Sequence, residues 1–189
     1  TLASPTIPRY LHAWRTSSFM LKSDLVNRIS AGYAAFLQPA RTPDSVITLR
    51  DICPIGYAND SDNHCAHFVS HVLGYQFGAT CRTMKRGQGT PGSIRVHEVF
   101  ARCVGVGRWD ELPVPLFWGL VFITNASNVT LGTQTMSNVP RKHIGIFYGG
   151  ARTIYHYSNS RHQVVSQTPQ QFSNHYPAPD NAMFWGGAP

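Results

Sequence analysis

The sequence is poor in charged residues, above all in acidic ones. Charged side chains make up 13% of the 189 residues, with nine Asp and Glu against 16 Lys and Arg. Because 42% of the residues are hydrophobic, this scarcity excludes a disordered chain, which carries many charges and few apolar residues. The basic excess gives a net charge of +7 and favours anionic partners such as acidic polymers.

Several patterns that would assign a class of function are missing. No apolar run approaches the roughly 20 residues that cross a bilayer, so we expect no stable membrane insertion. The basic residues are scattered, without a basic helix or an aromatic-basic repeat, so we expect no nucleic-acid partner. No repeat or linker divides the chain. We therefore expect a monomer with one domain over residues 1–189, in which residues 1–45 form a helical extension packed on the core.

The four cysteines do not show the spacing of a metal site. Cys53, Cys65, Cys81 and Cys103 are too far apart for a zinc ribbon or finger, and no C-x-x-C occurs. We expect no cofactor and no metal ligand among them. Disulfide pairing among Cys53, Cys81 and Cys103 stays open.

Periodicity divides the chain into helices followed by strands. Apolar residues at steps of four predict a helix over residues 18–38, and Asp62 or Asn63 and then Gly74 bound a second one. A third helix is expected over residues 93–104. Short β-branched and aromatic runs then predict antiparallel strands at residues 116–124, 143–148, 153–157, 163–165 and 182–185. This order indicates an α+β fold.

The second helix begins with the stretch "NHCAHFVSHVLG", which contains a candidate nucleophile. Cys65 stands in the first turn, where free backbone N–H groups and the helix dipole stabilise a thiolate. His143 opens a strand and could act as its base. Gly149-Gly150 predicts a hairpin that makes His156 a neighbour of His143, so His156 could orient its ring. Asn159 is the alternative third residue.

Other interpretations of the same residues remain open. An inward cysteine on an amphipathic helix is often a packing residue. His67 and His71, one turn apart, could share a metal, but no carboxylate pattern accompanies them. We expect His64, His67 and His71 to lie on a solvated polar face.

The order of several segments resembles the NlpC-type cell-wall cysteine peptidases, a papain-like superfamily related to the CHAP amidases. The segments, over roughly residues 53 to 186, are "NHCAHFVSHV", "WGLVFIT", "HIGIFYGG" and "TIYHYSNS". They stand where that family has D-C-S-G-F-V, G-D-L-V-F-F, H-V-G-I-Y-L-G and F-I-H-A-S. The resemblance implies a papain-like fold, with the nucleophile helix packed on a C-terminal antiparallel sheet. Position by position, it makes Cys65 the nucleophile, His143 the base and His156 the orienting residue.

The same resemblance implies a function and a location. It implies hydrolysis of amide bonds in peptidoglycan peptides, with Tyr57 as a candidate oxyanion donor. The backbone N–H of Cys65 is the other candidate donor, because it stands at a helix N-terminus. It also implies a protein that is secreted or delivered to the bacterial periplasm or cell wall, as a lysin or as an antibacterial effector with an immunity protein for partner.

A second resemblance points to lipid chemistry. "HCAHFVSHVLGY" is similar to the N-C-E-H-F-V motif of lecithin:retinol-acyltransferase-like enzymes. In those enzymes the base precedes the cysteine, and the upstream histidine here is His12. An acyltransferase or phospholipase is therefore the alternative activity, and a non-catalytic binding domain of the same fold is a third possibility.

Overall fold

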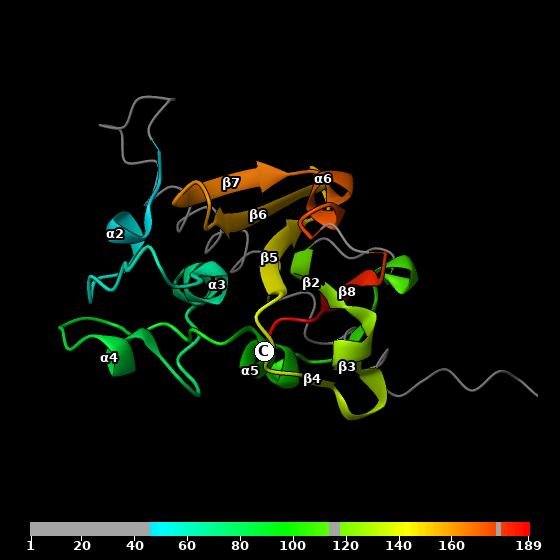
Figure 1. Ribbon diagram of the computed structural model, residues 1–189, viewed down its shortest axis with the longest axis horizontal. Helices are drawn as coiled ribbons and strands as arrows, with labels where there is room; N and C mark the ends of the chain where they lie inside the picture. Colours follow the sequence, from blue (N-terminus) through cyan, green and yellow to red (C-terminus); the bar gives the residue numbers. More distant parts are fainter. Residues whose placement is uncertain (1–45, 114–117, 177–178) are drawn as a thin grey trace, which may run out of the picture. The chain divides into compact units, whose positions relative to one another are not determined.

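The computed structural model describes residues 46–113, 118–176 and 179–189 (Figure 1). The helix expected over residues 18–38, the extension over residues 1–45, and His12 lie outside the described residues. No helix within the described ranges is long and apolar enough to cross a membrane.

The described helices are short. They are α2 (Leu49–Ile52), α3 (Cys65–Leu73), α4 (Cys81–Met84), α5 (Val96–Arg102) and α6 (Pro169–Ser173), with 3-10 turns at Trp109–Glu111, Ala126–Asn128 and Leu131–Thr133. The prediction of α3 is confirmed, and Gly74 ends it in the left-handed conformation at φ 78°. The third expected helix is confirmed as α5. The helices α2, α4 and α6 were not predicted, because four or five residues are too few to show a helical period.

The strands form one antiparallel sheet of six and one hairpin of two. The order across the sheet is β1 (Val106–Arg108), β8 (Asn181–Gly186), β2 (Trp118–Asn125), β5 (Lys142–Tyr148), β6 (Thr153–Ser158) and β7 (Gln163–Gln167), and the hairpin pairs β3 (Val129–Thr130) with β4 (Thr135–Met136). Each expected strand is confirmed, apart from residues 116 and 117, which lie outside the described ranges. The combination of helices and an antiparallel sheet confirms the α+β class.

The sheet is covered on both faces. On one face, Phe100 of α5 packs edge-on against Phe122, with ring centroids 5.0 Å apart. On the other face, Phe172 of α6 packs with Val121, Ile123, Phe147 and Ile154. Side chains alternate between the faces of a strand, so the central strands β2 and β5 are buried on both sides and their sequences read as nearly continuous apolar runs.

Helix α3 is enclosed, which contradicts the expectation of a solvated histidine face. His64 and His67 are 2% and 0% exposed. After Gly74 the chain folds back on itself, because Ser93 N–H donates to the Tyr75 carbonyl at 3.0 Å and Cys81 N–H donates to that of Gly92 at 2.9 Å. The histidines are therefore buried groups that need hydrogen-bond partners or ligands.

Gly145 allows β6 to approach β5 closely. A Cβ atom at this position would lie 2.6 Å from Cγ2 of Ile154 and 3.1 Å from the carbonyl oxygen of Tyr155. The same atom would lie 3.3 Å from Cβ of His156. Because one of these contacts is to backbone, the neighbours cannot all move away. A side chain at residue 145 would therefore push β6 away from β5.

We expect Gly145→Ala to destabilise the protein by about 1–3 kcal/mol, since it overpacks the junction of two central strands. Gly132→Ala is the matched control, because a Cβ there has no atom within 4 Å. Urea unfolding of both variants and the parent measures the difference. Equal midpoints for the two variants would contradict this packing argument.

Candidate active site

Cys65 is the first residue of α3 and lies against the backbone of β5. Its side chain is 1% exposed. The ladder between β5 and β6 ends at Ile146 and Tyr155, and the N–H of Ile144 instead donates to the Cys65 sulfur. Ile144 directly follows His143, so α3 delivers the thiol to the point on β5 where the predicted base stands.

Burial decides the protonation state of Cys65. It raises the pKa of the thiol to about 12, although hydrogen bonds from the N–H groups of Ile144 and Ala66 act in the opposite direction. From the sequence alone, a helix start is expected to stabilise a thiolate. In this enclosed position desolvation outweighs that effect, and the group is a thiol at neutral pH.

The two predicted histidines contact each other across the β5–β6 hairpin. Nε2 of His143 lies 2.8 Å from Nδ1 of His156, which confirms the expectation that the rings are neighbours. Nε2 of His156 lies 2.8 Å from Oε1 of Gln167 on β7. Three adjacent strands therefore contribute one side chain each to a continuous chain of hydrogen bonds.

This chain of hydrogen bonds fixes where the protons are. Oε1 of Gln167 can only accept, so Nε2 of His156 carries a hydrogen and its Nδ1 is an acceptor when the ring is neutral. His143 must then donate from Nε2, which leaves its Nδ1 with a free lone pair. That Nδ1 atom is buried and has no hydrogen-bond partner in the structure. Its free lone pair is what a general base requires.

A third histidine, which the sequence analysis did not single out, covers the base. His175 stacks on His143 with ring centroids 4.0 Å apart and planes at 20°. It follows α6, whose capping box of Thr168 and Gln171 turns the chain back toward the sheet. The residues "TPQQ" carried the signal for this turn, since a Thr followed by Pro and then Gln is typical of a helix start.

Tyr176, next to His175, connects the base with the thiol. Its pKa is raised by burial and then by the charge of Cys65. Its ring meets that of His175 edge-on at 4.7 Å. Tyr176 therefore lies near the candidate nucleophile and contacts His175, the ring that stacks on His143.

The remaining predicted site residues lie on the other side of Cys65. The side chain of Asn159 accepts from the N–H of His64 at 2.9 Å and donates to Asn63, so it holds the start of α3 and does not contact His143. The N–H of Cys65 donates to Oδ1 of Asn63 at 3.1 Å. The Tyr57 hydroxyl donates to Asp62. Both oxyanion candidates therefore already have acceptors.

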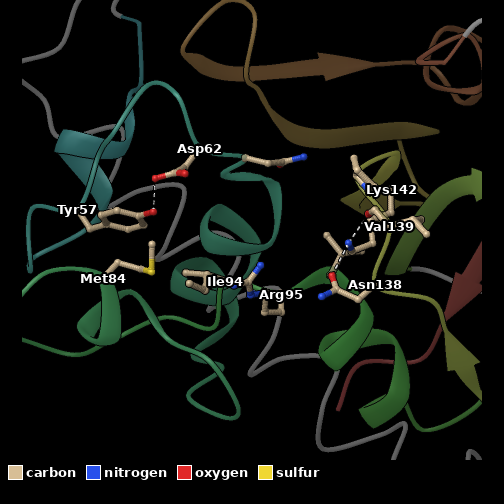
Figure 2. A pocket seen from close by; sticks show the side chains of 11 residues that line it. Tyr57, Asp62, Met84, Ile94, Arg95, Asn138, Val139 and Lys142 are labelled. Carbon is tan, nitrogen blue, oxygen red and sulfur yellow. Dashed lines mark hydrogen bonds between the residues drawn. The ribbon is translucent and has the colours of Figure 1, made fainter.

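A pocket of about 330 Å³ opens next to these residues. Its lining includes Tyr57, Asp62, Asn63, Arg95, Asn138 and Lys142. Figure 2 shows Lys142 bound to Asn138 on one side and Tyr57 bound to Asp62 on the other, with Arg95 between them. Asn63 precedes Cys65 by two residues and Lys142 directly precedes His143, but neither Cys65 nor His143 lines the pocket, and side chains alternate between the two faces of β5.

Two groups of side chains in the described part of the chain have the composition and closeness of metal ligands. One is His143, His156 and His175, and the other is Cys53, His67, His71 and Cys81; within each group the ligand atoms lie within 4.8 Å of one another. In the first group, Nε2 of His143 lies 2.8 Å from Nδ1 of His156, and in the second the Nε2 atoms of His67 and His71 are 3.0 Å apart. The second group was not predicted, because its cysteines are far apart in the sequence.

Comparison of the chain with models of known protein families, with characterised proteins and with solved structures gives no significant match. The similarity to NlpC-type peptidases therefore rests on the quoted motifs.

The free energy of unfolding should decrease at acidic pH. Burial lowers the pKa of His143, His156 and His175, the last to about 4. Below pH 6.5, the ordinary histidine pKa, the unfolded chain therefore binds more protons than the folded one. The free energy of unfolding should be insensitive to these rings above that pH and should decrease as the pH falls through 6 and 5.

His175→Phe removes one of these rings. The slope of the free energy of unfolding against pH should therefore decrease by the equivalent of up to one bound proton. Urea unfolding of parent and variant at several pH values between 7.5 and 4.5 measures both slopes. Identical slopes would show that His175 is not held neutral by the fold.

Proposed function

We propose that the protein is a papain-like cysteine hydrolase that cleaves amide bonds in peptides, with peptidoglycan peptides as the substrate class. The observation that carries the proposal is the hydrogen-bond chain from Gln167 through His156 to His143, which leaves Nδ1 of His143 buried and unpartnered, one residue before the Ile144 N–H that donates to the Cys65 sulfur. The segment order shared with NlpC-type peptidases supports the same assignment.

The first step is proton transfer from thiol to imidazole. Cys65 is a thiol and His143 is neutral, since burial raises the pKa of the first and lowers that of the second. Nδ1 of His143 removes the proton as the sulfur attacks the amide carbon. His156 accepts a hydrogen bond from Nε2–H of His143 and donates one to Gln167. These bonds stabilise the imidazolium that forms on His143.

The later steps use the same groups. The imidazolium of His143 gives its proton to the leaving amine as the C–N bond breaks, which leaves a thioester on Cys65. Water, deprotonated by His143, then hydrolyses the thioester and regenerates the thiol. The developing oxyanion needs a donor, and the N–H of Cys65 can serve once Asn63 releases it.

The pocket lined by Asn63, Arg95 and Lys142 suits a peptide that carries carboxylates. Arg95 and Lys142 provide positive charge, and Asn63 and Asn138 provide amide groups for backbone hydrogen bonds. Cell-wall peptides are rich in free carboxylates, and a net charge of +7 favours association with an acidic polymer.

Cys65→Ala should abolish hydrolysis while leaving a folded protein. Cys103→Ala is the matched control, because Cys103 is also a buried helix-associated thiol, bonded to the Val99 carbonyl, but far in sequence from the proposed chemistry. Each change should cost about 1 kcal/mol of stability. The parent and both variants are incubated with peptidoglycan sacculi and, separately, with phospholipid vesicles, and the products are identified by mass spectrometry.

Cleaved peptides from the parent and from Cys103→Ala alone would support the proposal. Acyl transfer or fatty-acid release from the vesicles would favour the lipid alternative. Turnover by a folded Cys65→Ala protein would remove Cys65 from the mechanism.

The orienting chain can be tested separately from the nucleophile. His156→Ala and Gln167→Leu should each lower kcat/KM by roughly tenfold or more, because His143 loses its fixed tautomer. His156→Asn should keep more activity than His156→Ala, since a carbonyl oxygen can still accept from His143. Asn159→Ala is the comparison, and a larger loss there than in His156→Ala would identify Asn159 as the residue that matters.

A further inference from the structure

Four potential metal ligands meet beside α3, away from the proposed catalytic residues. Cys53 follows α2, His67 and His71 lie one turn apart on α3, and Cys81 begins α4 (Figure 1). Their ligand atoms all lie within 4.8 Å of one another. Three of the four side chains are fully buried and the fourth is partly buried. We refer to them as the Cys2His2 cluster.

Three of the six distances among the ligand atoms of this cluster are close to those of a tetrahedral site. The sulfur atoms of Cys53 and Cys81 are 3.9 Å apart, the Nε2 atoms of His67 and His71 are 3.0 Å apart, and Cys81 Sγ lies 3.8 Å from Nε2 of His71. Zinc bonds of about 2.3 Å to sulfur and 2.0–2.1 Å to nitrogen give tetrahedron edges of about 3.8 Å between sulfurs and about 3.3 Å between nitrogens. The four ligand atoms are thus already spaced to surround one ion.

Neighbouring groups prepare His67 for this role. Nε2 of His64 lies 2.8 Å from the carbonyl oxygen of Asn59, so it must carry a hydrogen. When His64 is neutral, its Nδ1 is an acceptor for Nδ1–H of His67, 3.1 Å away. Nε2 of His67 then keeps its lone pair and faces the cluster. A ligand histidine whose other nitrogen donates to a fixed acceptor is the usual arrangement in metal sites.

The loop after α4 completes the surroundings. The N–H of Gly92 donates to Sγ of Cys81 at 3.3 Å, a contact that stabilises a thiolate ligand. Gly92 also passes very close to His71, since a Cβ there would lie 3.0 Å from Cδ2 of that ring. Both contacts hold ligand side chains in place.

We propose that Cys53, His67, His71 and Cys81 bind one zinc ion. Two thiolates and two imidazoles in a tetrahedron select zinc among the common divalent ions. Because the protein fills all four positions, no place is left for water or substrate, and the site is structural. It joins the end of α2 and the start of α4 to α3. This proposal replaces the expectation that the chain holds no metal. It does not depend on the proposed hydrolase activity.

The direct test is the metal content of protein that has been refolded with zinc and dialysed. We expect one zinc per chain by elemental analysis and by native mass spectrometry. Cobalt in place of zinc should give the intense visible bands of a tetrahedral ion together with sulfur-to-metal charge transfer. Absence of bound zinc, with a disulfide between Cys53 and Cys81 under non-reducing conditions, would overturn the proposal.

Variants locate the ion. Cys53→Ser should lose zinc and part of the sulfur-to-cobalt charge transfer, and His71→Ala should lose zinc, whereas Cys103→Ser and Cys65→Ala should keep one zinc. His64→Phe retains all four ligands but removes the acceptor for His67, so it should weaken zinc binding by about 10–100-fold. Zinc that survives Cys53→Ser but is lost in His175→Ala would place the ion at the other histidine group and refute this assignment.

Stability gives a readout that needs no ligand variant. A strong chelator should lower the melting temperature of the parent, and added zinc should restore it, because a ligand that binds the folded state stabilises it. No effect of the chelator on a protein shown to contain zinc would contradict a structural role.

Discussion

The burial of α3 is the constraint on which the rest of the structure depends. This helix carries a cysteine, a serine and two histidines, and its N-terminal two turns are almost without exposed surface. Burying polar groups is unfavourable unless each finds a partner, and the surroundings of α3 supply partners for its cysteine and histidines, although Oγ of Ser70 has none. Groups that contact the polar side chains and the start of α3 are the carbonyl of Asn59, the amide of Asn63, the N–H of Ile144 and the thiols of Cys53 and Cys81.

The same constraint explains how one short helix takes part in two different kinds of site. Its first residue meets the sheet at residues 142–144 of β5, which pair with β2 but not with β6, and the N–H of Ile144 there donates to the thiol. Its middle turn faces the loop that returns after Gly74, where side chains of metal-ligand type gather. Nucleophile and cluster share the helix but have different neighbours, so a change in one need not remove the ligands of the other.

Much of the fold could be predicted because its signals are local. The period of α3, its left-handed glycine at residue 74, and the alternation in β2, β5 and β6 are all written in contiguous residues. The contact between His143 and His156 followed from the Gly149-Gly150 turn. Exposure could not be predicted for His64 and His67, since it depends on a loop that folds back through contacts such as Ser93 with Tyr75. For the same reason the approach of Cys53 and Cys81, 28 residues apart, leaves no pattern in the sequence.

The location of these groups along the chain also bears on the order in which the molecule forms. The Cys2His2 cluster joins Cys53 to Cys81, which are 28 residues apart in the sequence. The hydrogen-bond chain of His143, His156 and Gln167 instead needs β5, β6 and β7, which come later in the sequence. Short loops close at a smaller entropic cost than long ones. The Cys2His2 cluster can thus assemble during synthesis before the strand that carries His143 exists. The surroundings of the Cys65 thiol are completed later, because they include the N–H of Ile144 on that same strand.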